Sequence, residues 1–191
     1  MISYLIGAIS FSYILTKKFK KVDIRKMGSG NAGATNTLRV LGVGPAITVL
    51  LLDVSKGIIA VLLGVTFSGD EWVIALCGLA AIIGHNWPIY YGFRGGKGVA
   101  TTIGVLAMLM FFPALYAGII AILTIVLTRY VSLGALLFMA FTTIFAGFSK
   151  NVPDPYFYLA MIVTLISFWR HRTNIQRLWN GTENKLSKKK D

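Results

Sequence analysis

The fold is decided by residues 45–66, PAITVLLLDVSKGIIAVLLGVT, which are long and apolar enough to cross a lipid bilayer. A transmembrane helix needs roughly 20 predominantly apolar residues, with about 17–25 tolerated. The whole chain repeats this pattern: of its 191 residues 55% are hydrophobic and only 14% are charged, and the mean hydropathy is +0.70. This composition cannot cover the surface of a soluble domain, and a disordered chain would be far less hydrophobic. The sequence therefore predicts an all-α integral membrane protein.

We expect one polytopic membrane domain over residues 1–191 with seven transmembrane helices. Their expected ranges are 1–16, 45–66, 72–91, 99–112, 114–128, 131–148 and 156–169. Residues 99–128 are long for one helix and hold Pro113 at their middle. A turn at Pro113 puts 17 of the 19 Lys and Arg residues on one side of the membrane. Because short cytoplasmic loops carry the Lys/Arg excess, the N-terminus is expected outside and the C-terminus in the cytoplasm.

The charge balance predicts where the chain resides. There are 19 Lys and Arg against 7 Asp and Glu, which gives a net charge of +12. In so hydrophobic a chain this surplus indicates a polytopic membrane protein with basic loops, in contact with membrane lipids, and no nucleic-acid partner. The first apolar run has no basic segment before it, so we interpret it as a retained helix and not as a signal peptide. Cys77 is the single cysteine and predicts neither a disulfide framework nor a thiolate metal site.

Three polar segments interrupt the apolar pattern, and the expected topology places all three at the cytoplasmic side. The first covers residues 28–39, GSGNAGATNTLR. It contains the letters G-x-G-x-x-G, but no strand precedes it, so a dinucleotide fingerprint is not expected. Glycines let backbone N–H groups approach an anion, hydroxyl and amide side chains add hydrogen bonds, and Arg39 can hold a phosphate bidentately. The alternative interpretation is a flexible loop capped by Asn and Ser.

The second segment covers residues 84–102, GHNWPIYYGFRGGKGVATT. Gly98 stands where a P-loop needs Ser or Thr after the lysine, so a Walker nucleotide site is not expected. Lys97 can still neutralise a phosphate as a point charge, and the start of the following helix can add N–H donors. His85 is a candidate functional residue, with a structural histidine as the alternative, and no carboxylate at a suitable spacing is visible to fix its tautomer.

The third segment covers residues 170–178, RHRTNIQRL. Basic residues after a last helix usually serve topology, but an amide such as Asn174 adds nothing to that bias. Inside the second expected helix, Asp53 and Lys56 are three residues apart and share a face, so we expect an ion pair, with support of the polar loop as the alternative. The sequence has no G-x-S-x-G elbow, no H-E-x-x-H and no close carboxylate cluster, so neither a metal nor a cofactor is expected.

The three segments, in this order and spacing, resemble the three motifs of the bacterial acyl-phosphate:glycerol-3-phosphate acyltransferases of the PlsY type. The resemblance covers essentially the whole chain. It implies a seven-helix fold with a cytoplasm-facing site that transfers a fatty acyl group from acyl phosphate to the 1-hydroxyl of sn-glycerol 3-phosphate. The products would be lysophosphatidate and phosphate, in phospholipid biosynthesis at the bacterial plasma membrane. An upstream enzyme would have to produce the acyl phosphate.

Acyl phosphate is a mixed anhydride with a good leaving group, so the protein has to supply mainly positioning and charge compensation. The expected catalytic residues are His85, Lys97, Arg39 and Asn174. The expected substrate-binding residues are Ser29, Gly30, Asn31, Gly33, Thr35, Asn36, Gly95, Gly96, Gly98 and Thr101. The alternative function is a membrane transporter or channel for a phosphorylated metabolite, since interrupted helices whose N-termini face an anion suit such proteins too.

Overall fold

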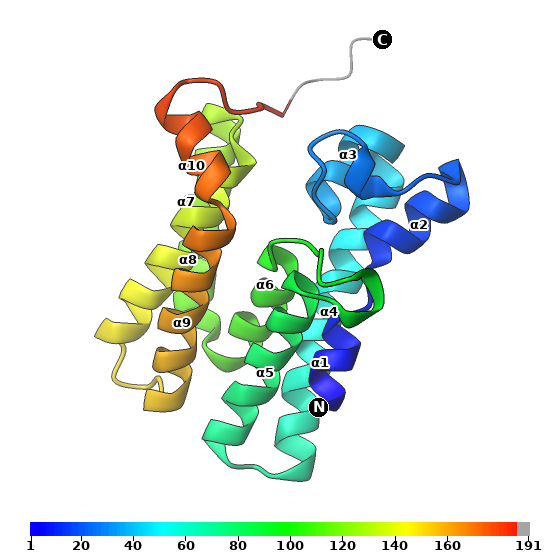
Figure 1. Cartoon of the computed structure of the whole chain (residues 1–191). Coiled ribbons are helices and arrows are strands. Elements are labelled where there is room, and N and C mark those ends of the chain that lie inside the picture. Colours follow the sequence, from blue (N-terminus) through cyan, green and yellow to red (C-terminus); the bar gives the residue numbers. More distant parts are fainter. Residues whose placement is uncertain (187–191) are drawn as a thin grey trace. The chain divides into compact units, whose positions relative to one another are not determined.

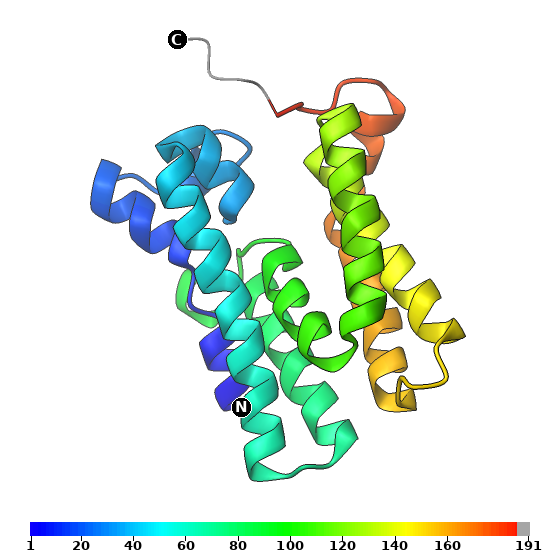
Figure 2. The same cartoon turned by 180° about the vertical axis from the view of Figure 1, so that it is seen from behind.

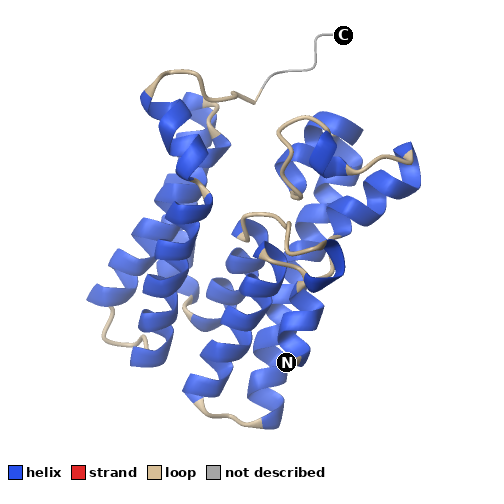
Figure 3. Ribbon diagram, in the orientation of Figure 1, coloured by secondary structure: helices blue, strands red, loops and turns tan. Residues whose placement is uncertain are grey.

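The computed structural model describes residues 1–186, and within them every regular element is helical (Figure 3). The chain divides into two compact units, Met1–Leu109 and a second one that begins at Met110. The first unit contains α1 (Ile2–Gly7), α2 (Phe11–Lys20), η1 (Ile24–Lys26), α3 (Ala34–Leu41), α4 (Val43–Phe67), α5 (Glu71–Asn86), η2 (Ile89–Tyr91) and α6 (Val99–Leu109) (Figure 1). The second contains α7 (Phe111–Thr128), α8 (Val131–Phe148), α9 (Asp154–Arg170) and α10 (Arg172–Trp179).

Four segments of the described chain are long and apolar enough to cross a membrane. They are Val43–Phe67, Glu71–Tyr91, Phe111–Thr128 and Val131–Phe148, and Val99–Leu109 is a shorter apolar helix. On α7 the side chains of Ile122, Val126 and Leu127 are 63%, 68% and 81% exposed. Large apolar side chains exposed in a row are what a lipid-facing helix requires. The integral membrane class is therefore supported, and the crossing number of seven and the orientation of the termini stay predictions.

The first unit is built around α4, which packs against α5 and α6 (Figure 2). Close backbone contact makes this packing possible: a Cβ added at Gly57 of α4 would collide with the carbonyl of Thr101 in α6. A Cβ added at Gly104 of α6 would in turn collide with the carbonyl of Val54 in α4. Small residues at a helix interface allow this approach in membranes, where van der Waals packing drives helix association. The interface thereby fixes the start of α6 beside the middle of α4.

The first apolar run forms two helices where one was expected over residues 1–16. α1 ends at Gly7, and α2 begins after Ser10, whose hydroxyl caps it by accepting from the Tyr13 N–H at 3.4 Å. The Ser10 carbonyl accepts from the Ile14 N–H at 3.0 Å, but the Tyr13 N–H goes to the Ser10 hydroxyl and so does not bond the Ile9 carbonyl. The break therefore leaves the Ile9 carbonyl open to a side-chain donor.

The interruption expected at Pro113 lies three residues earlier. α6 ends at Leu109, Met110 has φ −149° and ψ 65°, and α7 begins at Phe111. Pro113 then falls in the first turn of α7, where the missing N–H of proline has no helical partner to lose. All three polar segments, expected as cytoplasmic loops, are partly helical. The first includes most of α3, the second includes the end of α5, η2 and the start of α6, and the third includes most of α10.

Candidate active site

The first polar segment is organised by the side-chain amide of Asn36, which lies in the first turn of α3 and is 1% exposed. Its Oδ1 accepts from the backbone N–H of Ser29 at 2.8 Å. Its Nδ2 donates to the carbonyls of Ile24, Met27 and Asn31 at 3.2, 2.9 and 3.0 Å. One buried amide therefore determines the path of the backbone from η1 to the start of α3.

The glycines of this segment fit that arrangement. Gly28 and Gly30 have φ of +57° and +73°, a conformation that L side chains rarely adopt. A Cβ at Gly28 would also collide with Oδ1 of Asn36. Ser29 is exposed, Asn31 and Thr35 are half-buried, and Gly33 caps the start of α3. Arg39 is exposed in the last turn of α3.

The second polar segment folds back on the end of α5. The N–H of Gly95 donates to the Asn86 carbonyl at 3.3 Å, and the N–H of Gly96 donates to the His85 carbonyl at 3.1 Å. A Cβ added at Gly96 would collide with Nε2 of His85 and lie 2.6 Å from the carbonyl of Ala32. Gly96 is therefore the point at which the first segment, the second segment and the His85 ring meet. Lys97 follows as a half-buried side chain, just before α6 begins.

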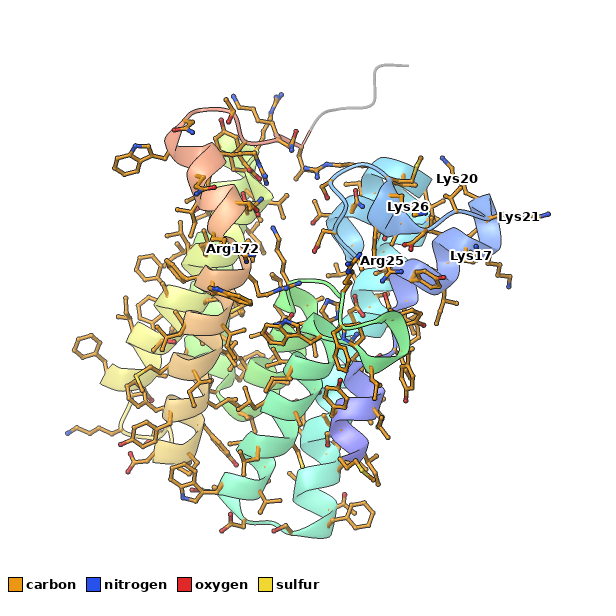
Figure 4. All side chains as sticks on the ribbon, in the orientation of Figure 1. Lys17, Lys20, Lys21, Arg25, Lys26 and Arg172 are labelled. Atoms are coloured by element: carbon orange, nitrogen blue, oxygen red, sulfur yellow. The ribbon has the colours of Figure 1, made fainter. Side chains whose placement is uncertain are left out.

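A basic cluster lies beside these two segments. Lys17, Lys20, Lys21 and Lys26 gather around the end of α2 and the chain that follows it (Figure 4). Arg25 is held differently, because its guanidinium pairs with Asp23 at 2.7 Å and donates to the Tyr91 carbonyl at 2.7 Å. The hydrogen bonds from Arg25 lower the pKa of Asp23 below its usual value. Arg25 thus joins the loop before α3 to η2 of the second segment.

His85 lies at the end of α5 against two charged residues of α4. Its Nδ1 is 2.8 Å from Nζ of Lys56 and 3.6 Å from Oδ1 of Asp53, and Lys56 and Asp53 pair at 2.8 Å. The three side chains are 6%, 2% and 2% exposed. The expected Asp53–Lys56 ion pair is confirmed. The expectation that no carboxylate stands near the His85 ring was wrong, because α4 brings Asp53 within 3.6 Å of Nδ1.

In the second unit, Asn174 of α10 is buried in a hydrogen-bond network centred on Glu183. The carboxylate accepts from Nδ2 of Asn174 at 2.6 Å, from the Ser132 hydroxyl at 2.9 Å and from Nε of Arg177 at 2.7 Å. Burial raises the pKa of Glu183, but these three hydrogen bonds outweigh it and lower the pKa overall. A carboxylate after the third motif therefore fixes the side chain that the sequence singled out.

The structure sorts the predicted site residues into groups. In the first unit it places Gly30, Asn31, Gly95, Gly96 and Lys97 in two segments that meet beside His85. Asn36 and Thr101 are fully buried, at 1% and 0% exposure, and Gly98 has φ +77°. Sequence reasoning missed the contact of Lys56 with His85, and the roles of Arg25, Ser132 and Glu183. For Lys56 a signal was present, because a charge inside a membrane helix requires a polar partner.

The comparisons with known proteins agree with the motifs. The family described as glycerol-3-phosphate acyltransferase matches residues 1–181. The glycerol-3-phosphate acyltransferases of Halalkalibacterium halodurans and Shouchella clausii are 65% and 62% identical to this chain. Each comparison covers 99% of this chain, with 94% and 95% of the respective relative.

Solved structures agree as well. A crystal structure of PlsY (YgiH), an integral membrane glycerol 3-phosphate acyltransferase, in its glycerol 3-phosphate form matches with a TM-score of 0.91 at 37% identity. That comparison covers 97% of this chain and 92% of that one. The lysophosphatidic acid form of PlsY matches with a TM-score of 0.87 at 36% identity. Fold and motifs together define a membrane-embedded acyltransferase. The chain belongs to the glycerol-3-phosphate acyltransferase family, which confirms the resemblance drawn from the three motifs.

Replacing Asn36 by Asp tests its part in the first segment. The Asp side chain keeps an acceptor for the Ser29 N–H but loses the donor to three carbonyls and places a negative charge beside them. We expect a loss of about 2–4 kcal/mol of stability, because buried acceptors are left unpaired. Asn36→Asp should lower the melting temperature in detergent and speed amide exchange over residues 28–33. The exposed Asn151 provides the matched control, Asn151→Asp, and equal behaviour of the two variants would contradict this role.

Replacing Glu183 by Gln tests the network around Asn174. The pKa of Glu183 is lowered in the folded protein, so its carboxylate stabilises the fold above the ordinary glutamate range and ceases to do so as the pH falls. At pH 7 we expect Glu183→Gln to cost about 1–3 kcal/mol, since hydrogen bonds to a charged group are lost. The difference should shrink below about pH 4, where the wild-type carboxyl also protonates. Thermal unfolding in detergent at both pH values measures it, with the exposed Glu71→Gln as control; a difference independent of pH would contradict the assignment.

Proposed function

We propose that the chain transfers a fatty acyl group from acyl phosphate to the 1-hydroxyl of sn-glycerol 3-phosphate, releasing lysophosphatidate and inorganic phosphate. The hydroxyl oxygen attacks the acyl carbonyl carbon, and the bond from that carbon to the phosphate oxygen breaks. The observation that carries the proposal is the meeting of the two glycine-rich segments at Gly96, beside His85. Relatives whose names include glycerol-3-phosphate acyltransferase, and solved glycerol 3-phosphate and lysophosphatidic acid forms of PlsY, support it.

Charge compensation is the main task of such a site, because both substrates carry phosphate. Arg39 and Lys97 are our candidates for holding the phosphates, as a bidentate fork and as a point charge. Exposed Ser29 would add a hydrogen bond through its hydroxyl. Asn31 and Thr35 would orient glycerol hydroxyls or an oxygen of acyl phosphate. Asn36 would act through the backbone it holds, since its amide is committed to Ser29, Ile24, Met27 and Asn31.

The membrane topology belongs to the same proposal. Seven crossings with an external N-terminus and a cytoplasmic C-terminus put the basic chain after α2 and the polar segments in the cytoplasm. The plasma membrane of a bacterium would then present the site to soluble glycerol 3-phosphate, while the acyl chain would stay among the apolar helices. An enzyme upstream would supply acyl phosphate.

An assay in detergent tests the reaction. Purified protein mixed with synthetic palmitoyl phosphate and glycerol 3-phosphate should release phosphate and lysophosphatidate in equal amounts, and glycerol should not replace glycerol 3-phosphate. Lys97→Gln and Arg39→Gln should each lower kcat/KM by about 10²-fold or more, the effect of removing one charge-stabilising group. Lys150→Gln, at an exposed cation outside the polar segments, is the control. No turnover in detergent, together with glycerol 3-phosphate uptake into sealed vesicles, would favour a transporter instead.

A second variant tests where the hydroxyl proton goes. We propose that His85 hydrogen-bonds a substrate and that a substrate phosphate oxygen accepts the proton. Because a glutamine amide can also hydrogen-bond from this position, His85→Gln should keep measurable turnover, less than about 10²-fold below wild type. A general base contributes about 10²–10⁴-fold. Complete loss of turnover with unchanged binding of glycerol 3-phosphate would instead identify His85 as the base.

A further inference from the structure

The buried row Asp53–Lys56–His85 has a use beyond holding two helices together. Asp53 and Lys56 lie one turn apart on α4, and His85 reaches them from the end of α5. All three side chains are more than nine-tenths buried. An ion pair alone would satisfy the charges of Asp53 and Lys56, so the third member needs its own explanation.

The hydrogen-bond donors of Lys56 explain why His85 belongs to this group. A lysine ammonium has three N–H donors and no acceptor. Nζ of Lys56 lies 2.8 Å from Oδ1 of Asp53, 3.0 Å from the Ile9 carbonyl and 2.8 Å from Nδ1 of His85. The Ile9 carbonyl is in reach because the chain breaks between α1 and α2. Lys56 thus forms an ion pair with Asp53 and hydrogen bonds with the Ile9 carbonyl and with Nδ1 of His85.

Proton affinity decides which of the two bases is protonated. With Asp53 ionised, the three side chains have no net charge in two protonation states. In one, Lys56 is protonated and His85 is neutral; in the other, Lys56 is neutral and His85 is protonated. In water an amine binds a proton about four orders of magnitude more tightly than an imidazole. Lys56 is also closer to Asp53 than His85 is, at 2.8 Å against 3.6 Å. Both factors leave the proton on Lys56, so Nδ1 of His85 accepts.

A neutral imidazole whose Nδ1 accepts carries its hydrogen on Nε2. We propose that Lys56 is a positioning residue that fixes His85 as the Nε2–H tautomer, so that the ring presents a hydrogen-bond donor where the two polar segments meet. Nε2 is the atom that a side chain at Gly96 would strike, one residue before Lys97. The donor is therefore directed at the segment assigned to substrate phosphate. The catalytic role of this donor rests on the proposed acyl transfer. The tautomer of His85 can be tested without that proposal.

A fixed donor suits the chemistry better than a free imidazole. If Nδ1 had no donor against it, the two neutral tautomers would exchange and the ring would offer a lone pair to substrate part of the time. A lone pair facing a phosphate oxygen repels it, whereas an N–H stabilises the charge that builds there. Lys56 would hold the productive tautomer before substrate arrives, which is preorganisation by a residue that does not touch substrate.

Nitrogen-15 NMR of histidine-labelled protein in detergent reads the tautomer directly. The chain has two histidines, and the spectrum of His85→Gln assigns the signals of His85. We expect the wild type to show a protonated Nε2 and an unprotonated Nδ1, the latter far downfield. A protonated Nδ1, alone or together with Nε2, would overturn the proposal.

A double variant tests the consequence for turnover. Lys56→Met alone would strand a buried carboxylate, so it is combined with Asp53→Leu, because replacing a buried ion pair by apolar residues of similar volume is often neutral. We expect the double variant to fold, to show both tautomers of His85 and to lose about 10-fold in kcat, with KM for glycerol 3-phosphate changed less than 3-fold. Lys150→Met is the matched control.

The outcomes separate the two proposals. A double variant with a single Nε2–H tautomer and wild-type kcat would overturn the role of Lys56. Should the double variant not fold, the wild-type spectrum still decides the tautomer. Wild-type protein that releases no phosphate from acyl phosphate would overturn the proposed function, while the His85 signals of the same sample independently report on Lys56.

Discussion

A buried ammonium group inside a membrane helix is the constraint on which the first unit depends. Removing a charge from water costs several kcal/mol unless a counter-charge and hydrogen bonds replace the lost hydration. Lys56 obtains these from three directions: Asp53 on its own helix, the Ile9 carbonyl before α2, and Nδ1 of His85 on α5. Satisfying one side chain therefore joins the α1–α2 break, α4 and the end of α5. The last of these carries the polar segment around Gly96, so the position of this segment depends on a side chain that is only 2% exposed.

The apolar runs allowed the helices to be predicted, but the sites at which helices break depend on contacts the runs do not encode. α8 occupies the expected residues 131–148, because its run is bounded on both sides by polar residues. Proline was the obvious candidate for ending a helix, yet Pro113 is tolerated in the first turn of α7 while Met110 leaves the helix. The break at Ser10 has no proline or charge to mark it. The freed Ile9 carbonyl accepts from Lys56, a residue that lies far along the chain.

The candidate site shows a similar division. Composition was enough to identify the segments rich in Gly, Ser, Thr and Asn as candidate functional segments between membrane helices. Residue type gives the capacity of a side chain for hydrogen bonding but not its direction. Asn36 and Asn31 are chemically identical, yet the first is turned inward to hold loop carbonyls and the second is half-buried. Likewise, the sequence distinguished Asn174 from its basic neighbours but did not indicate Glu183 as its partner. Only the folded structure shows that Asn174 donates to Glu183.

The acidic residues give an argument about the chemistry itself. Among residues 1–186, three carboxylates are ion-paired: Asp23 with Arg25, Asp53 with Lys56 and Glu183 with Arg177. The other three lie at helix N-termini: Asp70 caps α5, and Glu71 and Asp154 stand in first turns, where a negative charge is favourable. Each carboxylate in that part of the chain thus already has a structural task. His85, with Nδ1 facing an ammonium, is poorly placed to accept a proton. This use of the charges supports our proposal that an oxygen of a substrate phosphate accepts the hydroxyl proton.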